Sequence, residues 1–200
     1  MNHLQQLKEL EKLGNKLIRL AAESWDEHWK ILISTIMSAR TRDEVTIVVA
    51  DKLFKKYPTI EKLAEAELKE LENIIKSVNF YRNKSKNILN CAKTLAKEHN
   101  NIVPLNFEAL LKLPGVGRKT ANVFLSEIGK AAIGVDTHLA YCSQKLGWSK
   151  NKNPHKIEED LKKLFPRKLW KKINPIAVRF GKTYNSKKKK DEILEKINNR

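Results

Sequence analysis

Apolar residues recur at spacings of three and four along most of the chain, which is the pattern of amphipathic helices. The pattern predicts one helix over residues 4–17, a second over residues 29–37 and a third over residues 45–54. The third should end at Tyr57, because Pro58 disfavours helical geometry in the residue before it. No stretch alternates apolar and polar residues as a half-buried strand would, so the sequence predicts an all-α fold.

The same spacing predicts further helices along the rest of the chain. They are expected over residues 60–64, 68–75, 88–96, 107–111, 123–128, 139–146, 154–164 and 169–180. The last stretch, residues 187–197, fits either a charged helix or a frayed tail. No internal repeat and no long linker interrupts the series.

Residues 79–83 break the helical pattern, which places Phe80 and Tyr81 in a loop with Arg82 and Lys84 close behind. Aromatic rings among cations are typical of surfaces that bind nucleic acid. The alternative is that Phe80 or Tyr81 anchors the loop in the core. The pattern alone does not decide between the two.

A glycine-rich link joins two of the short helices. It lies in residues 113–122, which read Leu-Pro-Gly-Val-Gly-Arg-Lys-Thr-Ala-Asn. Gly115 and Gly117 have no Cβ atom, so the chain can turn sharply there and its amides can approach an oxyanion closely. Those amides lie at the N-terminus of the second helix, where unpaired N–H groups and the helix dipole favour a phosphate. The sequence therefore predicts a helical hairpin that holds the backbone of a nucleic acid.

Charge supports the same kind of partner. The 200 residues contain 40 Lys and Arg against 23 Asp and Glu, which gives a formal net charge of +17 and a pI near 9.8. Such a surface favours a polyanion and binding that weakens with salt. The alternative is an ordinary solvated, lysine-rich surface.

The two cysteines, Cys91 and Cys142, each lie within an apolar helical pattern and suggest core residues rather than a disulfide framework or a metal site. No run of about 18 apolar residues occurs, and the N-terminal segment is charged and amphipathic, unlike a signal peptide. We therefore expect a protein without a membrane partner, located in the cytoplasm and associated with the nucleoid.

The hairpin segment, taken with Val135-Asp136-Thr137-His138, resembles the endonuclease III family of helix-hairpin-helix DNA glycosylases. Residues 38–43 resemble that family's DNA-contacting helix end, and residues 80–84 resemble a loop near the flipped nucleotide. The resemblance runs from about residue 27 to residue 182. A hairpin alone would be weak evidence, because many non-enzymatic DNA-binding modules use one. The aspartate downstream makes the resemblance much more specific.

The resemblance implies a two-domain architecture. A helical barrel-like domain that contains the hairpin would cover residues 24–131, and residues 1–23 together with 132–200 would form the second helical domain. DNA is expected in the cleft between the domains. Lys119 and Asp136 would lie on opposite lips of that cleft.

Two residues are the predicted catalytic pair. By resemblance, Lys119 attacks C1′ of the damaged nucleotide and forms a Schiff base, which requires an unprotonated amine. Its place in the first turn of the second helix, beside Arg118, disfavours the ammonium form. Asp136 precedes a helix that it can cap, and by resemblance it also assists deprotonation of the lysine and stabilises positive charge on the sugar. The alternatives are a lysine that only contacts phosphate and an aspartate that only caps.

Arg40 and Phe80 are the predicted DNA-probing residues. Arg40 falls where the family often has a glutamine that fills the space left by the flipped nucleotide, and its planar donor fork suits an orphaned base and a phosphate together. Phe80 falls at a position where an apolar side chain holds neighbouring bases apart. His138 is expected to pack or to form a hydrogen bond and is assigned no proton transfer. The other predicted DNA contacts are Tyr81, Leu113, Gly115, Val116, Gly117, Arg118 and His138.

The sequence departs from the family in its cysteines. Typical members hold an iron–sulfur cluster with four cysteines that follow the segment corresponding to Phe180-Gly181, whereas no cysteine follows Cys142 here. We expect no cluster and no other cofactor. Apolar contacts should then close the second domain, from Ile176, Phe180, Ile193, Leu194 and Ile197. Residues 187–190, four lysines, either replace the cluster loop in contacting DNA or form a solvated patch.

The resemblance implies a bifunctional DNA glycosylase and AP lyase that acts as a monomer in base excision repair. Its partner would be double-stranded DNA with a damaged base or an abasic site, and its substrates would be oxidised or ring-saturated pyrimidines. Two alternatives remain open at this point. One is a mismatch, alkylated-base or 8-oxoguanine glycosylase of the same superfamily, and the other is a non-catalytic helix-hairpin-helix DNA-binding protein.

Overall fold

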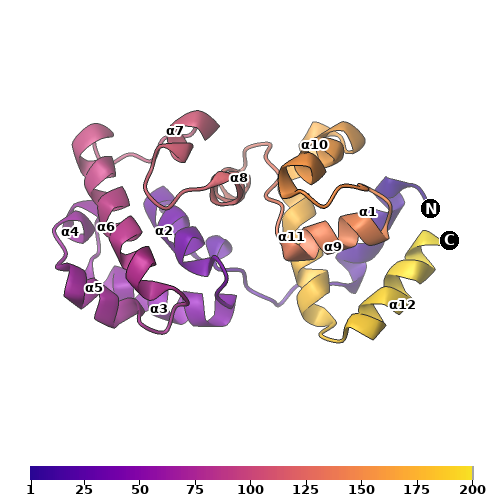
Figure 1. The fold of residues 1–200 in the computed structure, drawn as a ribbon, viewed down its shortest axis with the longest axis horizontal. Coiled ribbons are helices and arrows are strands. Elements are labelled where there is room, and N and C mark those ends of the chain that lie inside the picture. Colours follow the sequence, from indigo (N-terminus) through magenta and orange to yellow (C-terminus); the bar gives the residue numbers. More distant parts are fainter. Residues whose placement is uncertain (200) are drawn as a thin grey trace. The chain divides into compact units, whose positions relative to one another are not determined.

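The computed structural model describes residues 1–199, and every regular element within them is helical (Figure 1). The predicted all-α fold is therefore confirmed for this part of the chain. The elements are α1 (His3–Leu13), η1 (Ala22–Ser24), α2 (His28–Ser38), α3 (Asp43–Lys56), α4 (Ile60–Ala64), α5 (Leu68–Ile75), α6 (Tyr81–Glu98), α7 (Phe107–Leu111), α8 (Arg118–Glu127), α9 (Thr137–Lys145), α10 (Pro154–Leu164), η2 (Arg167–Leu169), α11 (Trp170–Thr183) and α12 (Lys187–Asn198).

The chain divides into two compact units. One is continuous and covers Arg19–Ile128, whereas the other joins Met1–Ile18 to the chain from Gly129 onward. The sequence-based boundaries, residues 24 and 131, lie close to these divisions. The hairpin segment belongs to the continuous unit, and the segment with Asp136 belongs to the unit built from both ends of the chain.

Helix α2 is the centre of the continuous unit and contacts η1, α3, α6 and α8. Its residues from Ile31 to Met37 are all buried, which fits a helix covered on most of its faces. The hydroxyls of Ser34 and Thr35 are satisfied within the helix, since both donate to the carbonyl of Ile31, at 3.0 and 2.7 Å. Helix α2 is therefore a buried helix with its polar side chains satisfied, and it ends at Ser38.

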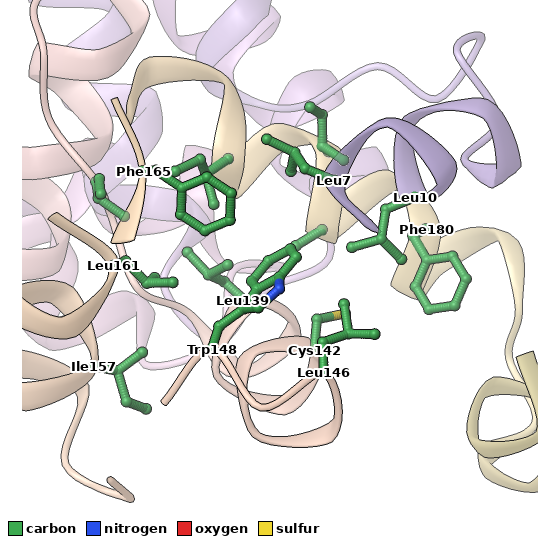
Figure 2. Packing of buried hydrophobic residues seen from close by; sticks show 14 of the residues in the cluster. Leu7, Leu10, Leu139, Cys142, Leu146, Trp148, Ile157, Leu161, Phe165 and Phe180 are labelled. Atoms are coloured by element: carbon green, nitrogen blue, oxygen red, sulfur yellow. The ribbon is translucent and has the colours of Figure 1, made fainter. Parts of the chain in front are cut away.

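The second unit is built around α9 and α11, against which α1, α10 and α12 pack. Figure 2 shows its core, in which Leu7 and Leu10 of α1 meet side chains from α9 to α11. The indole Nε1 of Trp148 donates to Gln6 Oε1 at 2.7 Å. This buried hydrogen bond joins the N-terminal segment of the unit to the segment that follows α9.

The C-terminal stretch forms helix α12. The Ser186 side chain caps it by accepting from the Lys189 amide, and Leu194 and Ile197 are buried in the core with Ile193 packed beside them. The frayed-tail alternative is wrong, and the predicted closure by apolar contacts is confirmed. The lysines at 187–189 are exposed.

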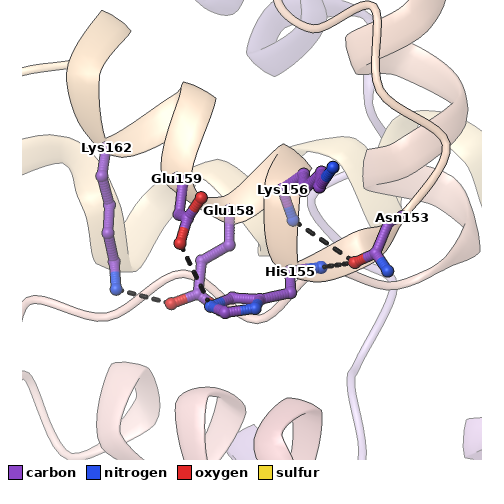
Figure 3. A network of polar contacts seen from close by, with 6 residues as sticks. All are labelled: Asn153, His155, Lys156, Glu158, Glu159 and Lys162. Atoms are coloured by element: carbon purple, nitrogen blue, oxygen red, sulfur yellow. Dashed lines mark hydrogen bonds and ion pairs between the residues drawn. The ribbon is translucent and has the colours of Figure 1, made fainter.

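Helix α10 starts at a proline, as the sequence predicts, and its polar face carries a network of its own (Figure 3). Asn153 accepts from the amides of His155 and Lys156, at 2.9 and 3.4 Å. Glu158 pairs with Lys162 at 2.5 Å one turn on. Such caps and i,i+4 pairs stabilise the helix itself, and they suggest no chemistry.

Two details differ from the sequence prediction. The first helix ends at Leu13 rather than Leu17, because Gly14 leaves the helical conformation and Asn15 accepts the Leu17 amide; Leu17 is 91% exposed. Tyr81, predicted in a loop, is the first residue of α6. Within residues 1–199, no helix is both long enough and apolar enough to cross a bilayer.

Candidate active site

The hairpin has the predicted form: α7 and α8 contact each other and are joined by residues 112–117. Gly115 has a φ of +79°, and a Cβ atom there would lie 2.8 Å from the Cβ of Asn87. Backbone conformation and space therefore both require glycine at this turn. The Arg118 guanidinium lies 5.0 Å from the ring centroid of Phe107, which ties the start of α8 to the start of α7.

Gly117 is the N-cap of α8 and differs from Gly115. Its φ is −90°, and no atom lies within 4 Å of where its Cβ would be, so neither strain nor crowding requires glycine here. No side chain caps the α8 N-terminus at this position. The first-turn N–H groups and the dipole thus face an uncrowded surface, as a phosphate-binding helix end requires.

Leu113 and Val116, predicted DNA contacts, have buried side chains. The Val116 amide also donates to the Leu113 carbonyl at 3.1 Å. Any DNA contact at these two positions is therefore a backbone contact, and their side chains anchor the link in the core.

Lys119 occupies the first turn of α8, as predicted, and is half-buried. A second lysine lies near it in the same unit. Lys84 is 7% exposed, and burial together with the charge of Lys119 lowers the pKa of Lys84 to about 8. Two amines therefore share this part of the unit, one buried and one accessible.

Asp136 is the N-cap of α9 and accepts from the Leu139 amide at 2.8 Å, which confirms its predicted capping role. His138, two residues on, lies against Gly181 of α11. A Cβ at Gly181 would be 2.1 Å from His138 Nδ1, so the histidine ring fills the space where a side chain would stand. This matches the predicted packing role of His138.

Arg40 and Phe80 lie together in the continuous unit. The Arg40 guanidinium is 5.1 Å from the ring centroid of Phe80, and both residues have left-handed backbones, with φ of 57° and 59°. Phe80 is 56% exposed, so it does not anchor the core. We call this pair the tip. Beside it, the Arg82 guanidinium lies 5.0 Å from the Tyr81 ring.

Three polar residues support the tip: Thr41, Asn79 and Lys84. The sequence pattern assigns no such role to Thr41 or Asn79, and it groups Lys84 with the cations of a nucleic-acid-binding surface, whereas Lys84 is buried. Asn79 donates from its amide to Thr41 Oγ1 at 3.1 Å and from its side chain to the Arg40 carbonyl at 2.5 Å. Lys84 donates to oxygens on both sides of Arg40. No sequence signal distinguishes the buried Lys84 from the exposed lysines around it.

The cysteines do not fit an iron–sulfur cluster. Cys91 of α6 and Cys142 of α9 are free and buried in different units, and burial raises the pKa of each thiol to about 12. Within residues 1–199, no group of three or more His, Cys, Asp or Glu side chains is placed to hold a metal ion. The two cysteines are fewer than the four ligands, mostly thiolates, that such clusters usually need.

Comparison with known proteins places this geometry in a family. Residues 33–167 match the profile of the HhH-GPD superfamily of base excision DNA repair proteins. Endonuclease III of Thermotoga maritima is 42% identical over 176 residues, which cover 86% of this chain and 83% of that protein. Endonuclease III of Synechocystis is 40% identical over 155 residues, covering 76% and 71%.

A solved structure gives the same result. The structure of a trapped covalent intermediate between endonuclease III and DNA matches with a TM-score of 0.80 and 33% identity, over 90% of this chain and 84% of the other. A thermostable thymine-DNA glycosylase matches with a TM-score of 0.83 but only 20% identity, which shows a shared fold.

Proposed function

Since the chain belongs to the endonuclease III family of HhH-GPD base excision repair proteins, we propose that it excises oxidised or ring-saturated pyrimidines and nicks the strand through a Schiff base on Lys119. Its general activity is that of a DNA glycosylase and AP lyase. The observation that carries the assignment of Lys119 is its place in the first turn of α8, directly after the uncrowded Gly117.

Base excision followed by strand cleavage requires one nucleophile and one carboxylate in a fixed position. The Lys119 amine attacks C1′ of the flipped nucleotide, and the C1′–N bond breaks with its electron pair leaving on the base. The nitrogen of Lys119 then gives up a proton and its lone pair forms the C1′=N bond of an imine, while the C1′–O4′ bond breaks and O4′ leaves as a hydroxyl. Loss of a proton from C2′ then expels the 3′ phosphate oxygen by β-elimination, and water releases the enzyme. Asp136, which caps α9, is assigned the role of assisting deprotonation of the lysine and stabilising positive charge on the sugar.

Recognition of the lesion is assigned to the hairpin and the tip. The α8 amides bind a phosphate of the damaged strand, Phe80 inserts where the bases part, and the Arg40 fork meets the orphaned base. The exposure of Phe80 and the open space at Gly117 support these roles. The active species is a monomer bound to duplex DNA.

The protein works without an iron–sulfur cluster. The buried cysteines and the apolar closure of the second unit by α12 support this proposal. Purified protein should be colourless, contain no stoichiometric iron and keep its activity with chelators present. Visible absorption in the usual range of such clusters, with matching iron, would contradict it.

Substrate choice is tested with a panel of duplexes that each carry one lesion, scored separately for base release and for strand nicking. Highest turnover on ring-saturated or oxidised pyrimidines, with nicking, supports the proposal. A preference for a mismatch, an alkylated base or 8-oxoguanine would instead select the alternative within the superfamily. The non-catalytic alternative is removed by the family assignment.

A further inference from the structure

Lys84 is a buried cation in the continuous unit, and a buried charge is tolerated only where its donors are satisfied. Its Nζ donates to the carbonyl of Met37 at 2.7 Å, to the carbonyl of Ala39 at 2.6 Å and to Thr41 Oγ1 at 3.2 Å. The three donors of one ammonium thus meet three acceptors.

These acceptors belong to the end of α2 and to the turn that follows it. Helix α2 ends at Ser38 with Ala39 as its C-cap, so the Met37 carbonyl is among those left without a partner inside the helix. A cation is favoured at this end of the helix dipole. Lys84 therefore serves as a C-terminal cap supplied by a distant helix, α6.

The capped turn carries Arg40, and the ammonium reaches oxygens on both sides of it, at Ala39 and Thr41. The left-handed backbone of a non-glycine residue is strained and persists only where neighbouring contacts fix it. Here Asn79 adds two more contacts, from its amide to Thr41 Oγ1 and from its side chain to the Arg40 carbonyl.

Phe80 is tied to the same lysine through the backbone. It is the left-handed N-cap of α6, and its carbonyl accepts from the Lys84 amide at 3.0 Å. The side chain of Lys84 thus holds the turn of Arg40, while the first turn of its own helix holds Phe80. Arg40 and Phe80 are held close together because Lys84 forms hydrogen bonds to the turn of Arg40 and to the carbonyl of Phe80.

We propose that Lys84 is a positioning residue for lesion recognition: its buried ammonium, with Thr41 and Asn79, holds Arg40 and Phe80 in the paired geometry in which the tip enters DNA. The proposal rests on the proposed function of the tip. Lys84 itself touches no DNA, because its Nζ is enclosed by the Met37, Ala39 and Thr41 oxygens. Pre-organisation of this kind lowers the entropy cost of inserting the two side chains.

The test is a double-mutant cycle on Lys84 and Arg40. The measured quantity is the preference for abasic DNA, which is the ratio of the affinities for an abasic duplex and an intact duplex. Lys84→Met keeps the length of the side chain and removes its donors. Affinity is measured at one salt concentration for a duplex with a tetrahydrofuran abasic analogue and for the intact duplex, since charge loss weakens both. We expect Lys84→Met and Arg40→Ala each to reduce the preference for the abasic duplex by about tenfold, the scale of one lost stacking contact. The double variant should lose little more than either single variant.

Lys93→Met is the matched control, because Lys93 is an exposed lysine of the same helix and its loss changes the net charge equally. It should leave the preference unchanged. An equal loss of affinity for both duplexes, or additive losses in the double variant, would overturn the positioning role.

If Lys84→Met fails to fold, Thr41→Val removes only the oxygen shared by Lys84 and Asn79 and should cause a smaller loss of preference. An unchanged preference in folded Thr41→Val would contradict the proposal. Borohydride trapping of the unaltered protein on abasic DNA distinguishes failure of the proposed function from failure of the positioning role. If the unaltered protein is not trapped, the proposed function is refuted. If it is trapped but Lys84→Met keeps the full preference for abasic DNA, only the positioning role is refuted.

Discussion

The guanidinium of Arg40 lies 5.1 Å from the centroid of the exposed Phe80 ring, and both residues adopt left-handed backbones. A cation stacked on an aromatic ring presents a flat, preformed surface with a ring face and a donor fork. The pair therefore has the features that stacking on parted bases requires, before any DNA is bound.

Phe80→Ala tests this surface. Because the ring is 56% exposed, its removal should leave stability nearly unchanged, whereas a buried Phe would cost about 3–5 kcal/mol of unfolding free energy. Binding to duplexes with an abasic analogue should weaken by roughly 1–3 kcal/mol, the scale of one aromatic–base stack. Calorimetric melting and titration of labelled duplex measure the two quantities. A large fall in melting temperature with unchanged affinity would place Phe80 in the core instead.

Lys119→Gln tests the nucleophile. Borohydride should trap a covalent adduct between the unaltered protein and abasic duplex DNA, and the variant should give none, because an amide nitrogen forms no imine. DNA binding should remain within a few-fold, since the α8 amides that face the phosphate are unchanged. Normal trapping by the variant would assign the imine to another amine.

Asp136→Asn tests the carboxylate without removing the cap, because an asparagine side chain can still accept the Leu139 amide. Single-turnover base removal should slow by on the order of 10² or more, as expected when a positioned proton acceptor and charge stabiliser is lost. Melting temperature should change little. Excision at the original rate would reduce Asp136 to its capping role.

Gly115→Ala and Gly117→Ala form a matched pair within one link. Alanine at Gly115 meets Asn87 at 2.8 Å and an unfavourable φ, so it should destabilise the protein by about 1–3 kcal/mol. Alanine at Gly117 meets nothing within 4 Å and should change stability by less than about 0.5 kcal/mol, while its methyl group crowds the phosphate and weakens DNA binding. Urea unfolding and duplex affinity separate the two effects. Equal destabilisation by both variants would contradict this division of roles.

The lowered pKa of Lys84 leads us to expect that the stability of the protein depends on pH. Its pKa is about 8 in the folded state and about 10.5 when unfolded, so between these values the unfolded state binds more protons. The contribution of Lys84 to the unfolding free energy should therefore rise with pH across this window, by up to about 3 kcal/mol. Urea unfolding of the protein and of Lys84→Met at pH 7.5, 9 and 10 checks this, because the tyrosines and thiols titrate alike in both. A difference between the two proteins that stays constant with pH would contradict it.

The sequence predicts local features well where one residue decides them. Asp136 caps its helix and Pro154 begins one, because each acts on the backbone within a turn of itself. Features decided by distant partners were not predictable. Lys84 can be buried because carbonyls at the end of another helix accept its hydrogen bonds. The His138 ring occupies its position because Gly181 has no Cβ atom.

The unit assembled from both ends of the chain has a consequence for synthesis. Helix α1 is made before the continuous unit, yet the helices that cover its apolar face, α11 and α12, are made after that unit. At typical elongation rates, Leu7 and Leu10 wait on the order of ten seconds for their partners, during which the continuous unit can already fold on the ribosome. Newly made chains therefore carry an uncovered N-terminal helix, a segment that chaperones can engage until Phe180 arrives.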